Sequence, residues 1–320
     1  MNKSLLFLLV ILFALAIEAK AQQRPQYSQY MVNNYLLNPA ITGIEDYADI
    51  RISHRRQWVG LDGAPVTSYV TAHTPLNKGA ASTKYTRALA HHGVGVAFHT
   101  DKTGPLRRTG ISGSYAYHLP LTRSINASAG AAVGLIRNSI NASELEFTNP
   151  NDPLIGGGSF NNNVIDLSLG LWIYSESFSL GVAGAQLLED VGSFQPEGSR
   201  NPTLDLQRHY FITGAYRFSP TDRLDVVPSV MVKMASPSPV SVDANVRVLY
   251  NRQFWAGASY RHEDALVAMV GVYISPLLDV SYSYDVTSSN LNQVSAGTHE
   301  VVVGFKLFNN RRIICPQWIW

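Results

Sequence analysis

The sequence predicts an all-β protein: a transmembrane antiparallel β-barrel of about 14 strands, preceded by an N-terminal signal peptide. Three observations predict this class. Only 15% of the 320 residues are charged, against about 25% in a typical soluble domain. Mean hydropathy is nevertheless −0.01 and 46% of the residues are hydrophobic, values too low for a helical membrane protein with several apolar spans of about 20 residues. Most of the chain instead alternates apolar and polar residues, as barrel strands do.

The charge balance excludes one class of partner. Lys and Arg number 25 and Asp and Glu 23, which gives a net charge of +2. A protein that binds nucleic acid through phosphate contacts needs a basic surplus. We therefore expect no nucleic-acid partner.

Residues 1–21 have the features of a secretory signal peptide. Lys3 is followed by an apolar stretch from Leu5 to Ile17, and Ala19 and Ala21 are small residues at the two positions that a signal peptidase reads. An uncleaved anchor is the alternative, for which this stretch is short. The chain has a single cysteine, Cys315, so no intrachain disulfide can form.

Residues 22–45 are predicted to form a periplasmic or plug-like segment. Tyr27–Leu37 is compatible with a short amphipathic turn or helix, which Asn38-Pro39 would end. Wall side chains alone do not fill a barrel of about 14 strands, so the lumen is expected to hold either water or a plug. The tyrosines and amides of this segment suit a polar lumen. Packing inside the barrel or sealing its mouth is one interpretation, and a simple lead-in that stabilises the barrel end is the other.

Residues 46–308 are predicted to form the barrel. In Leu278–Val286, for example, apolar and polar residues alternate without interruption. Short turns alternate with longer polar connections, and an even strand count places both termini on the periplasmic side of an outer membrane. The strands are predicted to begin near Tyr47, Val66, Gly93, Thr109, Arg123, Val164, Phe178, Gln207, Arg223, Val240, Phe254, Ala265, Leu278 and His299.

A soluble β-sandwich is the alternative fold with the same period of two. The predicted strands are long, at about ten residues, whereas sandwich strands have more often about 5–6. Aromatic residues also gather near the segment ends, which is typical of the two interfacial girdles of a barrel. The expected girdle residues are Trp58, Trp172, Tyr174, Phe178, Tyr216, Phe218, Phe254, Trp255 and Tyr273.

The polar faces of the predicted strands carry charges of both signs. They would line either a mixed-charge pore or a lumen filled through ion pairs. The candidate lumen-lining residues are Arg51, Asp166, Arg217, Lys233, Asp243, Arg247, Asp279, Asp285, Glu300 and Lys306.

The two ends of the chain supply the candidates for plugging the barrel or docking a partner. The tail, residues 309–320, follows the last strand and places apolar residues after Arg311-Arg312, so we expect it to dock onto a partner or into the barrel. The candidate plug or partner-docking residues are Tyr27, Gln29, Tyr30, Asn38, Pro39, Trp58, Trp318 and Trp320.

No pattern indicates catalysis, a metal or a cofactor. His91 and His92 are adjacent, but a strand places them on opposite faces, and no acidic residue or cysteine has ligand spacing. Nucleophile-elbow, zinc-protease and phosphate-loop motifs do not occur. An outer-membrane hydrolase remains a third hypothesis that nothing in the sequence favours.

A series of short motifs resembles the PorP/SprF family of the type IX secretion system of Bacteroidota. They occur in the expected order over nearly the whole chain after residue 21. The motifs are Pro25–Met31, Asn38-Pro39-Ala40, Arg56–Pro65, Ala72–Leu76, Gly93-Val94-Gly95, Asp101–Pro105, His209-Tyr210-Phe211, Pro228-Ser229-Val230, Phe254–Arg261, Tyr284-Asp285 and Gly297–Glu300.

The resemblance implies an integral outer-membrane barrel without enzymatic activity. Members assist the secretion or surface anchoring of a specific cargo, such as a gliding adhesin, that carries a C-terminal sorting domain. The implied partners are outer-membrane lipid, the cargo, and components of the secretion machine on the periplasmic side. The alternative function is that of an outer-membrane porin or small-solute channel.

Overall fold

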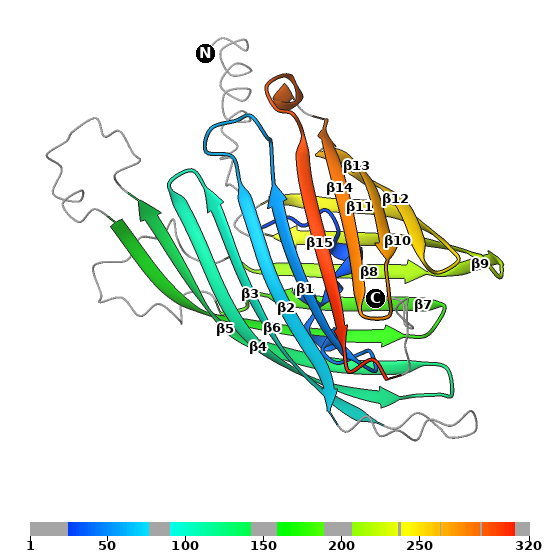
Figure 1. The fold of residues 1–320 in the computed structure, drawn as a ribbon. Helices are drawn as coiled ribbons and strands as arrows, with labels where there is room; N and C mark the ends of the chain where they lie inside the picture. Colours follow the sequence, from blue (N-terminus) through cyan, green and yellow to red (C-terminus); the bar gives the residue numbers. More distant parts are fainter. Residues whose placement is uncertain are drawn as a thin grey trace, which may run out of the picture.

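The computed structural model describes residues 25–76, 90–141, 159–188, 207–235, 238–262, 264–288 and 290–310. Antiparallel strands wind around one lumen, and the N-terminal segment of the described chain lies within it (Figure 1). The predicted signal peptide lies outside the described residues. So do Trp318 and Trp320, with the rest of the tail beyond Asn310.

The strands occur at the places that the alternation predicts. Their bounds are β1 (Ala48–Arg56), β2 (Val66–Leu76), β3 (His91–Thr103), β4 (Leu106–Pro120), β5 (Asn126–Asn141), β6 (Ser159–Tyr174), β7 (Phe178–Ala185), β8 (His209–Tyr216), β9 (Phe218–Thr221), β10 (Leu224–Ala235), β11 (Ser238–Tyr250), β12 (Phe254–Arg261), β13 (Ala265–Tyr273), β14 (Leu278–Thr287) and β15 (Thr298–Leu307).

These fifteen elements of the described chain form a closed ring of fourteen wall strands. Each strand pairs antiparallel with its neighbour in sequence, β1 pairs with β15, and β10 pairs with β11. β8 and β9 count as one wall strand because both pair with β10 and only Arg217 separates them. The predicted barrel is confirmed, and the β-sandwich is wrong, because a single sheet closes on itself and leaves no edge.

A proline explains the interruption between β8 and β9. The last pair between β8 and β10 joins Ala215 with Ser229, and Pro228 is the next residue of β10. Proline has no backbone N–H to donate to the neighbouring strand, so the ladder breaks beside it. Pairing resumes at Phe218, opposite Val226.

The two faces of the wall differ as a barrel in a lipid bilayer requires. Along β14, for example, Asp279, Ser281 and Asp285 are buried towards the lumen, whereas Tyr282 and Val286 are exposed on the outside. Many outward side chains are large and apolar, which is what a lipid-facing band needs. Within the described residues, no helix is both long and apolar enough to cross a membrane.

The two rims of the barrel carry different connections. We call the rim where β1 begins and β15 ends the proximal rim, and the other the distal rim. Residues 121–125, 175–177, 222–223, 251–253 and 274–277 connect strands at the proximal rim, and the longer 142–158 and 186–208 do so at the distal rim. Four connections depart from this division: 77–90 is proximal and long, and 104–105, 236–237 and 262–264 are distal and short.

The expected aromatic girdle is correct for only part of its members. Tyr216, Phe218 and Phe254 are half-exposed on the outside, near the proximal rim. For four of the aromatic residues the prediction is wrong, because they occupy inward positions of the alternation and are buried in the lumen. These four are Trp172, Tyr174, Trp255 and Tyr273.

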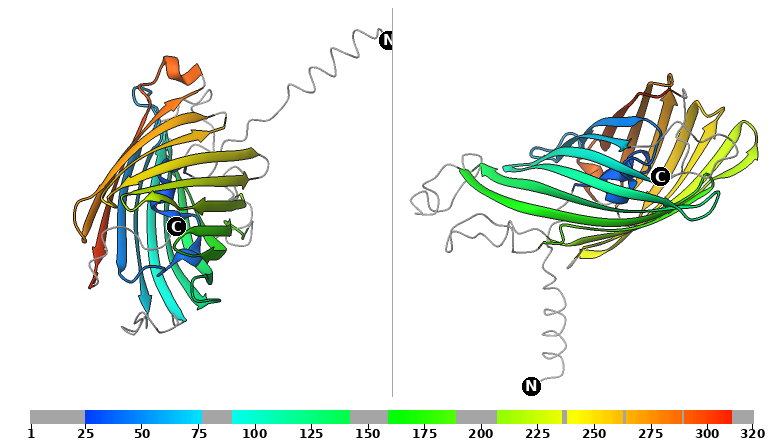
Figure 2. Two further views of the ribbon diagram at one scale, coloured as in Figure 1. Left: turned by 90° about the vertical axis from the view of Figure 1, so that its right-hand side faces the viewer. Right: turned by 90° about the horizontal axis from the view of Figure 1, so that it is seen from below.

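Residues 25–45, which we call the lumen segment, run inside the barrel (Figure 2). In place of one amphipathic helix, the segment forms the short 3-10 turns η1 (Tyr30–Val32), η2 (Asn34–Leu36) and η3 (Pro39–Ile41). Asn38 caps η3 by accepting a hydrogen bond from the Ala40 N–H, and Pro39 occupies the first position of the turn. The capping explains why Asn38-Pro39 ends the earlier turn and begins a new one.

Two wall glycines allow the lumen segment to touch the backbone of the barrel. A Cβ atom on Gly93 of β3 would overlap the carbonyl oxygen of Thr42. A Cβ atom on Gly130 of β5 would meet the backbone of Pro39 and Ala40. Backbone atoms cannot rotate away as a flexible side chain does, so both positions need glycine.

We predict that Gly130→Ala destabilises the barrel by about 1–3 kcal/mol, because the new methyl group overpacks this contact. Urea unfolding of the vesicle-inserted protein, followed by tryptophan fluorescence, measures the change. Gly113→Ala is the matched control, since a Cβ at Gly113 of β4 meets nothing within 4 Å. Equal effects of the two substitutions would contradict the close approach.

Candidate functional site

The inner wall together with the lumen segment forms the candidate site. The segment starts near the distal rim, where Gln26 lies 3.5 Å from Arg261, the last residue of β12. It ends at the proximal rim, where Tyr47 directly precedes β1. The described chain therefore traverses the lumen from one rim to the other before the first strand begins.

A buried cluster of charges holds the start of the segment. The backbone N–H of Ser28 donates to Glu300 of β15 over 2.7 Å, and its hydroxyl donates to Asp285 of β14 over 2.5 Å. Arg55 of β1 pairs with Asp285 at 3.2 Å and with Glu300 at 3.5 Å. One guanidinium thus pairs with two carboxylates, and Ser28 donates a hydrogen bond to each of them.

A second cluster lies deeper, towards the proximal rim. The guanidinium of Arg51 pairs with Asp49 at 2.8 Å and with Asp279 of β14 at 3.0 Å. Lys306 of β15 lies 3.7 Å from Asp279, and its ammonium stands 4.6 Å from the centre of the Tyr273 ring. All these groups are buried, so each charge is compensated by opposite charge or by a ring face.

A third cluster borders the start of η1. Arg261 of β12 pairs with Asp243 of β11 at 3.1 Å and with Asp264 at 3.0 Å. Asn245 of β11 donates to the Tyr30 hydroxyl over 2.5 Å. The same stretch of wall thus combines an ion pair with a hydrogen bond to the segment.

Amide side chains of the segment bond the wall directly. Gln29 is fully buried and its Nε2 donates to the backbone carbonyl of Glu300 over 3.0 Å. The Nδ2 of Asn38 donates to the carbonyl oxygens of Leu171 over 3.0 Å and Val182 over 3.3 Å. These bonds pair the buried amide groups of the segment with backbone carbonyl groups of the wall strands, as buried polar groups require.

Three wall histidines hold the end of the segment. The Gly43 N–H donates to Nδ1 of His73, and Nε2 of His91 lies 3.1 Å from the Gly43 carbonyl oxygen. Nε2 of His118 lies 2.8 Å from the Thr42 carbonyl oxygen, and the His91 and His118 rings stack at 4.4 Å. His92 faces the opposite side of the wall, beside Tyr115.

Tyrosines of the segment fill the spaces between these polar contacts. Tyr27 packs edge-on against Tyr69 of β2, with ring centres 5.4 Å apart. The Tyr35 hydroxyl and the Ser114 hydroxyl of β4 are hydrogen-bonded at 2.8 Å. This bond ties the middle of the segment to the wall.

The remaining predicted residues line less crowded parts of the lumen. Asp166 of β6 accepts a hydrogen bond from the Gln186 N–H over 2.9 Å, and Arg247 of β11 lies 5.5 Å from the Trp255 ring centre. Lys233 of β10 is half-buried beside the start of the segment. Arg217 is half-buried at the break between β8 and β9 rather than inside a strand.

Trp58 is the one described docking candidate outside the lumen segment. It lies in the distal connection between β1 and β2 and has a positive φ of 47°. Its backbone N–H donates to the Thr298 hydroxyl over 3.1 Å. It is half-buried at the distal rim, so it belongs to the mouth of the barrel and not to the contacts of the segment.

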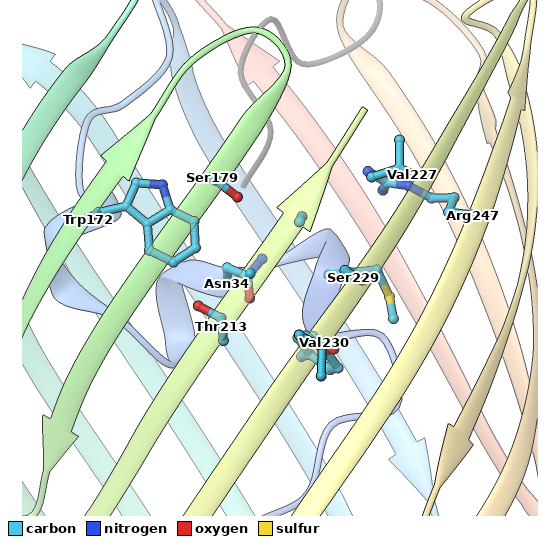
Figure 3. Close-up of a pocket in the computed structure, with 12 residues that line it drawn as sticks. Asn34, Trp172, Ser179, Thr213, Val227, Ser229, Val230 and Arg247 are labelled. Carbon is cyan, nitrogen blue, oxygen red and sulfur yellow. The ribbon is translucent and has the colours of Figure 1, made fainter. Parts of the chain in front are cut away.

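Small cavities lie between the described part of the segment and the wall. One of about 20 Å³ lies between Asn34 of the segment and Trp172, Thr213 and Ser229 of the wall (Figure 3). Another of about 60 Å³ lies beside Tyr35 and extends to Asp166. A space of about 20 Å³ holds roughly one water molecule, so these cavities are gaps in a filled lumen.

The chemistry that the described side chains of the site show is that of binding. Among the residues that the structure describes, no group of three or more His, Cys, Asp or Glu side chains could hold a metal ion. The charged side chains of the three clusters are instead engaged with one another and with the segment. The arrangement holds a piece of chain in place.

Several residues of these contacts are absent from the predicted set. Arg55 and Asp49 lie on the same face as Arg51, and Arg261 lies on the polar face of its strand, so the alternation contains the signal for all three. His73 and His118 give no such signal, because their partners are backbone atoms of residues far away in sequence.

We predict that Arg55→Met destabilises the protein by about 3–5 kcal/mol, because Asp285 and Glu300 lose the buried charge that pairs them. Urea unfolding in vesicles measures the loss. Arg56→Met is the matched control, since the neighbouring Arg56 is exposed on the outside of the same strand. A variant at position 55 as stable as its control would show that the ion pairs do not hold the segment.

Comparisons with solved structures agree on the fold. The toluene transporter TbuX of Ralstonia pickettii matches with a TM-score of 0.50 at 10% identity, over 88% of this chain and 93% of that one. The toluene transporter TodX of Pseudomonas putida gives 0.49 at 9% identity, over 86% and 93%. Omp33 of Acinetobacter baumannii gives 0.46 at 12% identity, over 83% and 100%. At such identities the likeness concerns the fold alone.

Comparisons of sequence identify the family. No curated protein matches the chain. The family described as type IX secretion system membrane protein PorP/SprF matches residues 19–305, which include every described strand except the last two residues of β15. The chain therefore belongs to the PorP/SprF family of type IX secretion system membrane proteins.

Proposed function

We propose that this outer-membrane barrel assists the secretion or surface anchoring of one cargo protein with a C-terminal sorting domain, by protein–protein recognition and without catalysis. The observation that carries the proposal is the filled lumen. Buried hydrogen bonds to the wall hold the lumen segment near its start, its middle and its end, and Glu300, which accepts from Ser28, is itself ion-paired with Arg55. A barrel filled in this way offers its rims, and not a pore, to other molecules.

The proposed orientation puts the proximal rim in the periplasm. Most proximal connections are short and most distal ones longer, which is the usual arrangement in outer-membrane barrels. β15 then ends on the periplasmic side, where the tail would meet other components of the machine. In this orientation the first described residues lie near the distal, outward rim, which does not favour the expected periplasmic N-terminus, whereas the entry into β1 lies on the periplasmic side.

The alternative function is a porin or small-solute channel. It requires a continuous path, whereas the cavities beside the segment have volumes of about 20 to 60 Å³. Removal of the segment would be needed before such a path exists. The proposal therefore treats conduction as the property that distinguishes the two functions.

We predict that the full chain conducts little in planar bilayers and that deletion of residues 25–43 produces large, stable single channels. The physical reason is that the deletion removes the side chains that fill the lumen while leaving all strands. A heat-modifiable band on gels checks that the deleted barrel still folds. Large conductance of the full chain, unchanged by the deletion, would support the channel.

We predict that replacement of residues 142–158 and 189–206 by short Gly-Ser linkers abolishes co-purification of the sorting-domain cargo from outer membranes. These are the long connections of the distal rim, where loops provide recognition surface without affecting the barrel. Truncation of residues 313–320 is the companion variant and tests the periplasmic side. Cargo binding that survives both changes would exclude recognition at the rims.

A further inference from the structure

One cavity in the proximal half of the barrel is lined by buried polar groups without a hydrogen-bond partner among the residues that the structure describes. It has a volume of about 20 Å³ and lies between the lumen segment and the wall strands β6, β7, β8, β10 and β11. The unpartnered atoms are Asn34 Oδ1, Trp172 Nε1, Ser179 Oγ and Arg247 Nε. Folded proteins contain few such groups, so a set of them around one cavity indicates a site for another molecule. We call the cavity and these four residues the proximal pocket.

The proximal pocket is buried on one side and reachable on the other. Asn34, Trp172 and Ser179 are exposed by only 2–7%, whereas Arg247 is half-buried. The three wall residues lie within a few positions of the proximal ends of β6, β7 and β11. Figure 3 shows the Arg247 side chain extending from β11 towards the lumen segment. A ligand can therefore reach Arg247 from the proximal mouth of the barrel.

Two indole rings that lie flat against the wall fix the shape of the pocket. A Cβ atom on Gly181 of β7 would overlap the ring of Trp172, and one on Gly271 of β13 would overlap the ring of Trp255. The guanidinium carbon of Arg247 lies 5.5 Å from the centre of the Trp255 ring, within the range of a cation–π contact. The guanidinium is therefore oriented before any ligand binds.

The charge of Arg247 is not used inside the barrel. Arg51, Arg55 and Arg261 pair with carboxylates at 2.8–3.5 Å, whereas no ion pair joins Arg247 to an acidic residue of the described chain. Asp225 on the neighbouring strand β10 accepts a hydrogen bond from Ser219 and pairs with Arg252 at 3.6 Å. The N–H groups of Arg247 thus remain for a ligand.

The donors of the pocket indicate the chemistry of that ligand. An indole and a guanidinium can only donate hydrogen bonds, and a hydroxyl can donate one. Rotation of the Asn34 amide presents its NH2 group to the same space. A water molecule would pair with some of these donors but would bring no negative charge to Arg247. An oxyanion supplies both acceptors and charge.

We propose that the proximal pocket binds a carboxylate group that enters from the proximal mouth. Arginine forms two parallel hydrogen bonds with a carboxylate, and Trp172 and Ser179 supply further donors from the opposite side. The cavity holds roughly one water-sized group, which favours a planar carboxylate over a bulkier tetrahedral phosphate. The carboxylate belongs either to a small acid or to an acidic side chain of a partner. The inference does not rest on the proposed secretion function.

The test is fluorine NMR of the full chain, labelled with fluorotryptophan and titrated with propionate in detergent micelles. The signals of Trp172 and Trp255 should shift in a saturable way, because their rings border the bound carboxylate. The signal of Trp58, in the distal connection between β1 and β2, should not move. Single Trp→Phe variants assign the signals.

Matched variants identify the residues that bind. Arg247→Gln should weaken the affinity about ten-fold, the usual effect of losing a hydrogen bond to a charged group, and Ser179→Ala about three-fold. Arg247→Lys keeps the charge without the planar fork and should fall between the two. Arg123→Gln removes an exposed charge from a turn at the same rim and should leave the affinity unchanged. A heat-modifiable band checks folding, and Arg247→Lys with Ser179→Ala carries the test if Arg247→Gln does not fold.

A second titration distinguishes the two sources of the carboxylate. The probe is a short peptide with blocked ends and one glutamate as its only charge. Tighter binding of this peptide than of propionate supports the pocket as a site for a protein partner. Equal affinities support the pocket as a site for a small acid.

Three results would overturn the proposal. The first is a Trp172 signal that propionate and the glutamate peptide both leave unchanged. The second is equal affinity in the unaltered protein and in folded Arg247→Gln or Arg247→Lys. The third is equal affinity for the uncharged propionamide or for inorganic phosphate, which would show that the pocket does not select a carboxylate.

Discussion

The structure depends on the compensation of charges buried on the inner wall, and most of all on the cluster of Arg55, Asp285 and Glu300. A lipid-facing surface excludes carboxylates, so the acidic residues of the strands all lie inside. Inside, away from water, an ionised group is stable only when it is paired and hydrogen-bonded. Ser28 completes this cluster with two short hydrogen bonds. The lumen segment therefore depends on the charges of the inner wall and supplies hydrogen bonds to them.

This dependence connects the two ends of the chain. The wall residues that bind Ser28 lie on β14 and β15, whereas Arg55 lies on β1, which closes the barrel against β15. The segment cannot make these contacts until the last strands have formed. Contacts between Ser28 and Glu300 span 272 positions of sequence. Barrel closure and docking of the segment are therefore coupled steps, and the same ion pairs stabilise both.

The sequence predicts the barrel well because its signal is local. Val66, Phe178, Phe254, Ala265 and Leu278 begin strands where the alternation places them, since inward and outward positions follow from a period of two. Trp172 and Trp255 were misplaced because aromatic residues near strand ends suit either a lipid interface or a crowded lumen, and only their position in the alternation distinguishes the two. The residues before and after each tryptophan therefore indicate whether it faces the lumen or the lipid.

The contacts of the lumen segment are the part that local patterns do not predict. His73, His91 and His118 lie on three different strands, and each meets a backbone atom of Thr42 or Gly43. The 3-10 turns of the segment are too short to give a periodic signal. The need for glycine at positions 93 and 130 follows only from the close approach of the segment's backbone, which the sequence does not show.

The distribution of charge also explains how a filled barrel can act in the membrane. Inside, both signs are present and neutralise each other around the segment, so the lumen has little left to offer a diffusing solute. Outside, the exposed arginine and lysine side chains of the described strands lie at one rim. Under the proposed function, other molecules meet the rims of the barrel and not a pore. A protein that holds a cargo or a machine component in place at the membrane needs those surfaces and no open channel.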